Sequence, residues 1–99
     1  MKDAFISKIG VYGQMHYRYL KENKPSVVNV MRMKGTLKPY LEAVNKDAEE
    51  MLARLETEMA KAEGVTEALK WKDQMAWVAR KNSIRARAME IVQQEVICV

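Results

Sequence analysis

The residues best suited to chemistry are two groups of Lys and Arg side chains, and the chemistry they suit is contact with phosphate. The first group lies near the start of the chain and is interleaved with tyrosines. Its members are Arg18, Lys21, Lys24, Arg32, Lys34 and Lys38. Such side chains donate to phosphate oxygens of nucleic acids. They span a predicted helix, a turn and a second predicted helix, a layout that loosely resembles a helix-turn-helix. We interpret residues 14–38 as the better of two candidate nucleic-acid surfaces.

The second basic group lies near residue 83, on a predicted C-terminal helix. It consists of Arg80, Lys81, Arg85 and Arg87 and surrounds the small polar residues Asn82 and Ser83. Basic and small polar side chains on a helix suit phosphate contacts. These four side chains point in several directions, however, so they cannot all meet one groove. We expect one or two of them to pair with Glu or Asp of the neighbouring helix.

Two tryptophans, Trp71 and Trp77, are candidates for binding a protein partner, because Trp often concentrates binding energy at interfaces. The alternative is that both belong to the core. They lie six residues apart, on helix sides about 120° from each other at 100° per residue. A small fold has difficulty burying both. We therefore predict that at least one indole is partly exposed beside Arg80 or Arg85.

No pattern in the chain predicts catalysis, a metal site or a cofactor. His16 is the only histidine, Cys98 is the only cysteine, and no cluster with metal-ligand spacing exists. The tyrosines lack the Arg and His partners that a nucleophilic tyrosine needs. The glutamates of residues 47–63 follow a solvated helix face. We expect a protein that is not an enzyme and holds no metal or cofactor.

The cysteine count and the hydropathy bear on location. A single cysteine allows no disulfide within the chain, which fits a reducing cytoplasm. No apolar run approaches the roughly 20 residues of a membrane span, and the start MKDAFISKIG lacks the apolar core of a signal peptide. We expect a cytoplasmic protein with no membrane partner.

Charge is unevenly distributed along the 99 residues. Residues 1–38 carry a net charge of +6, residues 39–68 carry −5, and residues 69–99 carry +3. One interpretation is a basic surface that attracts a polyanion. The other is that the segments neutralise each other across the fold. The sequence leaves both open.

The periodicity predicts an all-α fold, a small bundle of four to five helices built on a long C-terminal hairpin. The expected helices cover about 14–23, 25–34, 36–44, 47–63 and 66–96 of one domain, after an irregular lead-in over residues 1–9. Apolar residues between Ala48 and Ala62 recur at steps of three and four, which is typical of an amphipathic helix. Asn45 or Asp47 is expected to begin that helix, since Asp47 and Glu50 have capping-box spacing.

The hairpin turn is predicted from its capping residues. Gly64 suits a helix C-cap, and Thr66 suits the N-cap of the next helix. We expect Leu52, Leu55 and Met59 to pack against Leu69, Met75 and Ala76, because these sets flank one tight turn. A bend near Asn82 and Ser83, or two separate helices, is the alternative to one continuous helix over 66–96, since both residues are weak helix formers.

Several long strings in the chain resemble the small transposon-encoded proteins of the TnpV family. The strings are MAKAEGVTE–LK, DQMAWV and NSIRARA–EIV, together with YGQMHYRYLKENKP near the start. They agree with the family in order and spacing over most of the chain from Gly10 onward. The resemblance implies an accessory protein of bacterial mobile elements and implies no reaction.

These observations favour binding over catalysis. The leading hypothesis is a mobile-element accessory protein that contacts nucleic acid, or a nucleoprotein complex, through its basic surface. The alternative is a small protein-binding inhibitor or regulator, for instance of a host-defence nuclease of the CRISPR type. The identity of the partner and the oligomeric state remain open.

Overall fold

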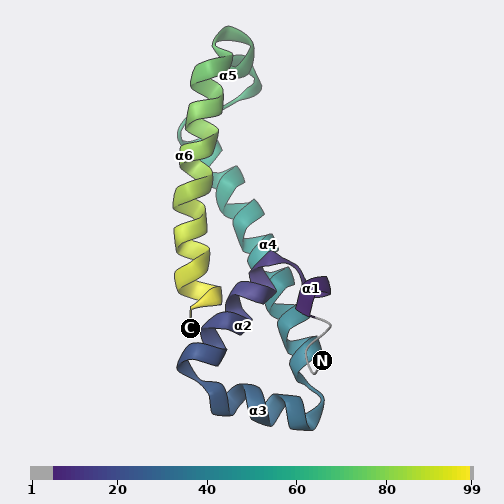
Figure 1. The fold of residues 1–99 in the computed structure, drawn as a ribbon. Helices are drawn as coiled ribbons and strands as arrows, with labels where there is room; N and C mark the ends of the chain where they lie inside the picture. Colours follow the sequence, from purple (N-terminus) through teal and green to yellow (C-terminus); the bar gives the residue numbers. More distant parts are fainter. Residues whose placement is uncertain (1–5, 99) are drawn as a thin grey trace.

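Helices account for every regular element of the protein in residues 6–98, the range that this computed structural model describes (Figure 1). The all-α prediction is confirmed. The elements are α1 (Ile6–Ile9), α2 (Val11–Asn23), α3 (Pro25–Lys34), α4 (Leu37–Ala62), α5 (Glu67–Lys72), α6 (Gln74–Val92) and the π-helical turn η1 (Gln93–Ile97).

The molecule is elongated, with extents of 55 × 22 × 17 Å. Its radius of gyration is 17.0 Å, against about 13 Å for a compact domain of this length. Figure 1 shows the reason: α4 and α6 run along the long axis and converge toward α5, while α3 crosses the opposite end. α2 fills the space between the far ends of α4 and α6. The two ends are therefore separate surfaces.

The end of α2 and both boundaries of α3 agree with the sequence signals, whereas α2 begins at Val11, three residues before the predicted start. Pro25 occupies the first position of α3, where its missing N–H costs nothing, and Lys24 is the one residue that separates the two helices. Gly35 ends α3 in a left-handed conformation. The expected lead-in over residues 1–9 lies partly outside the described residues. Within them, Ile6–Ile9 form a helical turn, with Ile9 buried, so irregular structure was the wrong prediction there.

Residues 37–62 form one helix, where the sequence predicted two. Nothing interrupts it, because Pro39 falls within the first turn and no Gly or Pro follows before Gly64. Asn45 does not cap α4; it lies within the helix and bonds to another one. Its Oδ1 accepts from the backbone N–H groups of Tyr12 and Gly13, both at 3.1 Å. Asn45 thus caps the N-terminus of α2 from outside.

Glycine allows α2 to approach α4 this closely. A Cβ added at Gly13 would collide with the side chain of Ile9 and lie 2.9 Å from the carbonyl oxygen of Leu41. Real Cβ atoms essentially never come so near a backbone oxygen. The glycine therefore lets Asn45 reach the first turn of α2 and satisfy donors that a helix start leaves unpaired.

The hairpin turn has the predicted caps, but the second helix is broken. Gly64 adopts φ 70°, and the Thr66 hydroxyl accepts from the N–H of Leu69 at 3.5 Å. Asp73 then begins a new helix, since its Oδ1 accepts from the N–H of Ala76 at 3.0 Å. The helix is continuous through Asn82 and Ser83, so a bend there was the wrong alternative.

The break at Asp73 changes which residues of α4 and α6 meet. Leu52 packs in a cluster with Ala88 and Val92, and the half-buried Leu55 and Met59 lie against the same cluster. Met75, predicted to face them, is 84% exposed. The predicted pairing was wrong because α5 takes up the residues after the turn, so that a later part of α6 reaches α4. A second cluster joins α1, α2 and α3 to the start of α4 around Leu41.

A buried histidine fastens the C-terminal turn to this framework. His16 of α2 is 1% exposed, and its Nδ1 lies 2.6 Å from the carbonyl oxygen of Ile97. Because a carbonyl only accepts, Nδ1 carries a hydrogen and donates it, and Nε2 forms a hydrogen bond with the Tyr40 hydroxyl at 2.8 Å. Burial raises the pKa of Tyr40, which keeps this hydroxyl protonated. Both ring nitrogens of His16 thus have hydrogen-bond partners within the fold.

Candidate nucleic-acid interface

α3 presents one face to the protein and a broad face to solvent. Val28 is buried, and Met31 and Arg32 beside it are half-buried. On the opposite side Val30 is 48% exposed and Met33 is 88% exposed. We define the α3 surface as this outward face together with the lysines at its ends: Lys24, Ser26, Asn29, Val30, Met33, Lys34 and Lys38, all of them exposed.

The lysines of the α3 surface lie at helix boundaries. Lys24 joins α2 to α3, Lys34 is the last residue of α3, and Lys38 is the second residue of α4. No acidic residue occurs between Glu22 and Glu42 in the sequence. Cations therefore bracket α3 at both ends, and no carboxylate within this segment neutralises them.

The remaining residues of the predicted N-terminal group have different positions. Arg18 and Lys21 are exposed on α2, and the Lys21 ammonium lies 5.2 Å from the centre of the Tyr17 ring. Arg32 turns inward: its guanidinium donates to the Tyr17 hydroxyl at 3.3 Å and to Asn29 at 3.1 Å. Arg32 thus holds α3 against α2, while the lysines project into solvent.

Two members of the second basic group pair with acidic residues. Arg87 pairs with Glu63 at 2.8 Å, and Arg85 lies 3.9 Å from a carboxylate oxygen of Glu56. The hydrogen bond from Arg87 lowers the pKa of Glu63 below its ordinary value, and the charge of Arg87 adds to the effect. The expectation that one or two of these side chains pair with acids of the neighbouring helix is confirmed. Arg80 remains exposed.

The two indoles have different surroundings. Trp71 on α5 is 86% exposed, which confirms that at least one is accessible. Trp77 on α6 is half-buried between two ammonium groups, with Lys70 at 4.9 Å and Lys81 at 5.8 Å from the ring centre. Two lysines therefore contact the Trp77 ring in cation–π geometry, and Arg80 lies three residues after Trp77 on α6.

Sequence reasoning missed the uncharged part of the α3 surface. Ser26, Asn29, Val30 and Met33 were not selected, because only charge was used to define the candidate site. The absence of acidic residues between positions 22 and 42 is a signal that could have marked the whole segment. The sequence offered no comparable signal for Asn45, whose partners lie more than 30 residues away.

Two further findings concern metal binding and membrane spans. Within residues 6–98 no three His, Cys, Asp or Glu side chains come together in a way that could hold a metal ion. In the same range no helix has the length and apolar character needed to cross a membrane. The free thiol of Cys98 is exposed beside the hollow between α2 and η1.

Comparison with known protein families identifies a match over nearly the whole chain. The sequence profile of a family described as transposon-encoded protein TnpV matches residues 1–97. No curated protein and no solved structure is detectably similar to the chain.

Proposed function

Because the chain belongs to the TnpV family of transposon-encoded proteins, we propose that it is a non-catalytic accessory protein of a mobile element that binds nucleic acid through the α3 surface. The observation that carries the proposal is the placement of Lys24, Lys34 and Lys38 at both ends of an exposed helix, in a segment without acidic residues. Phosphates repel carboxylates and attract clustered cations, so such a segment suits a polyanion.

The uncharged residues of the α3 surface suit the same partner. Asn29 offers an amide and Ser26 a hydroxyl, groups that can bond to base edges or phosphates. Val30 and Met33 offer apolar contacts, of the kind that thymine methyl groups accept. A single exposed helix is the element that fits the major groove of a duplex. The α3 surface therefore combines positioning groups at its ends with contact groups in its middle.

A salt-dependent binding measurement tests this function. Fluorescence anisotropy with a labelled DNA duplex should give tight binding at low salt and steep weakening as salt rises. Each phosphate contact contributes about 0.9 to the slope of log K against log salt concentration. Changing Lys24, Lys34 and Lys38 together to Glu should abolish the binding and leave the helical circular dichroism unchanged.

A charge-matched variant provides the control. Lys46, Lys61 and Lys72 are exposed on α4 and α5, away from the α3 surface. Changing these three to Glu gives the same net charge as the α3 variant. It should retain most of the binding at low salt. Equal loss in both variants would mean that net charge alone attracts the duplex, and no binding by the unaltered protein at low salt would reject the function.

A second candidate function is binding of a protein target as an inhibitor or regulator, and the specific observation in its favour is the exposure of Trp71. A large ring at the end of an elongated molecule is a suitable anchor for a partner. Affinity capture from the host cell, with and without nuclease treatment, separates the two functions. A protein partner should survive nuclease and high salt and be lost in Trp71→Ala. Arg80→Ala should mainly slow association.

A further inference from the structure

Asn29 lies in the middle of the α3 surface, and its amide is held in one orientation. Arg32, one turn further along α3, donates from a guanidinium nitrogen to the Asn29 Oδ1 atom at 3.1 Å. Arginine has hydrogen-bond donors only, so the amide atom that faces it is the oxygen. The orientation of the Asn29 amide thus follows from the chemistry of its partner.

The guanidinium that holds Asn29 is itself fastened to the protein core. Arg32 is half-buried, and a second nitrogen of its guanidinium lies 3.3 Å from the hydroxyl of Tyr17. The Tyr17 residue is buried on α2. A planar guanidinium with two partners has little freedom to rotate. Arg32 therefore orients an exposed amide from a side chain that is anchored inside the fold.

The nitrogen end of the Asn29 amide is left for a ligand. Asn29 is exposed, and among the hydrogen bonds of residues 6–98 none is donated by its Nδ2 atom. Both hydrogens on Nδ2 can therefore be donated to a partner. The oxygen end meets the cationic Arg32, which polarises the amide and strengthens its N–H donors. Asn29 accordingly offers a partner two donors, where a free amide would offer a donor and an acceptor.

The position of Asn29 on the α3 surface suits contact with base edges. It lies five residues after Lys24 and five residues before Lys34, or about 7.5 Å along the helix axis from each. Phosphates bound by these two lysines would place the middle of the helix over the groove between them. The major groove is about 12 Å wide and admits a helix. Asn29 is then the amide side chain that can reach the bases.

We propose that Asn29 reads guanine in the major groove and that Arg32 is the positioning residue that gives it this preference. The proposal rests on the proposed function, binding of a duplex by the α3 surface. Guanine presents two acceptors in the major groove, N7 and O6, which match the two donors of Nδ2. Thymine presents one acceptor, and cytosine presents an amino group that would oppose Nδ2.

The contact with Arg32 disfavours adenine, the common partner of asparagine. A free asparagine pairs with adenine because its oxygen accepts from N6 while its nitrogen donates to N7. In this protein the oxygen already accepts from Arg32. An adenine amino group that bonded to the same oxygen would have to lie beside the guanidinium cation. Without Arg32, the same amide should prefer adenine.

Selection from a pool of DNA duplexes with a randomised central segment tests the proposal. Duplexes that the full chain retains at low salt are sequenced, and one position should be enriched in guanine. In Asn29→Ala that enrichment should disappear. Fluorescence anisotropy with two duplexes that differ only at this base pair should give at least about fivefold tighter binding to guanine than to adenine, and nearly equal binding in Asn29→Ala.

Two further variants should change the preferred base. Asn29→Asp has a similar shape but presents acceptors only, so the enriched base should become cytosine, whose amino group donates. Arg32→Ala frees the amide oxygen, so the enriched base should become adenine. A purely structural role of Arg32 would alter affinity and not the identity of the enriched base. Circular dichroism checks the fold, and the exposed substitution Asn29→Asp tests the proposal even if Arg32→Ala loosens α3.

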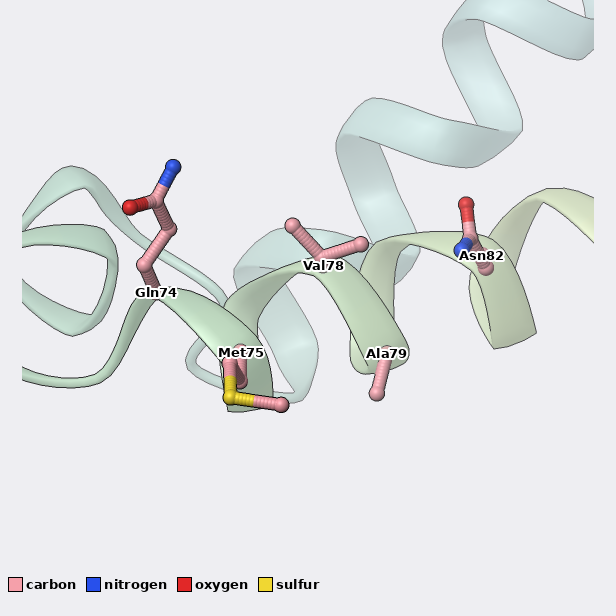
Figure 2. A pocket seen from close by; sticks show the side chains of 5 residues that line it. All are labelled: Gln74, Met75, Val78, Ala79 and Asn82. Carbon is pink, nitrogen blue, oxygen red and sulfur yellow. The ribbon is translucent and has the colours of Figure 1, made fainter.

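A second exposed amide provides the matched control. Asn82 lies on α6, which Figure 1 shows apart from α3, and Figure 2 shows it with Val78 and Ala79 at an open hollow of that helix. Asn82→Ala removes the same side chain and should leave the enriched base unchanged. A guanine preference that survives Asn29→Ala, or salt-dependent binding without a preferred base, would overturn this proposal and leave the proposed function standing. Absence of binding at low salt would reject both.

Discussion

The two ends of the molecule expose similar apolar side chains in different electrostatic settings. Met33 at the α3 end is as exposed as Trp71 and Met75 at the α5 end. Around α3 the lysines have no acidic neighbours in the sequence between Glu22 and Glu42. In the second half of α6, Arg85 and Arg87 reach Glu56 of α4 and Glu63 just after it.

This difference indicates that exposure alone does not identify the kind of partner. Glu56 of α4 and Glu63 just after it offset arginine charge along α6. The first five residues of α4 hold no acid, so no carboxylate close in sequence offsets the lysines of the α3 surface. The two ends also differ in packing, since the cluster around Leu41 joins four helices near α3, whereas α5 has no buried residue.

The largest expected effect tests the difference in packing between the two ends of the molecule. Leu41 is fully buried where α2 meets α4, so Leu41→Ala should lower the free energy of unfolding by about 2–5 kcal/mol. Met75→Ala, at the exposed end, should change it by less than about 0.5 kcal/mol. Urea denaturation of the two variants measures both values. Similar losses would contradict the view that stability resides near α3.

The next effect concerns the external cap of α2. Asn45→Ala leaves the N–H groups of Tyr12 and Gly13 without their partner, which should cost about 1–3 kcal/mol. Asn82→Ala removes an exposed amide at the other end. Thermal melting of both variants should show a clear drop for Asn45→Ala only.

A smaller effect should be confined to the α5 end. Asp73→Ala removes the N-cap of α6 and should destabilise that helix start by about 1 kcal/mol. Hydrogen exchange is the appropriate measurement, because it resolves segments. Exchange should quicken in residues 74–77 while α3 is unchanged. Equal acceleration at both ends would show that the ends unfold as one unit.

The smallest effect is the pH dependence of the Glu63–Arg87 pair. Arg87 holds the pKa of Glu63 below its ordinary value, so the stabilisation is present above the ordinary pKa and is lost as pH falls through the lowered one. The pair is exposed, so salt should weaken it. Melting curves of the protein and of Glu63→Gln should converge as the pH falls, and Arg87→Ala should remove the difference. A difference that grows toward acid pH would contradict this sign.

Local signals in the sequence predicted most helix boundaries. Pro25, Gly64 and Thr66 act on neighbouring residues only, and each has the predicted role in the structure. The predicted class of fold follows from the same short-range information. The residues of α4 and α6 that meet depend on where α6 begins. Asp73 separates α5 from α6, but it lies between two good helix formers, so the sequence gave no reason to expect a helix break there.

The other wrong predictions concern side chains that can bond either within their own helix or to another one. Asn45 has the side chain of an N-cap, and it does cap a helix, but that helix is α2 and not its own. A pattern of spacing along one helix cannot reveal a partner that tertiary packing supplies. The candidate site shows the same limit: the sequence indicated its lysines, whereas the inward turn of Arg32 depends on the Tyr17 hydroxyl.

The uninterrupted course of α4 gives the molecule a mechanical property. Its 26 residues span about 39 Å at 1.5 Å per residue and join the last turn of α3 to the turn before α5. After Pro39 in its first turn the helix contains no Gly or Pro, so the rest of it moves as a stiff lever. A tilt of about 10° in its first turn would carry its far end by roughly 7 Å, which exceeds the 5.4 Å pitch of a helical turn. Any ligand that tilts the start of α4 would therefore shift Trp71 by a distance that a binding partner could sense.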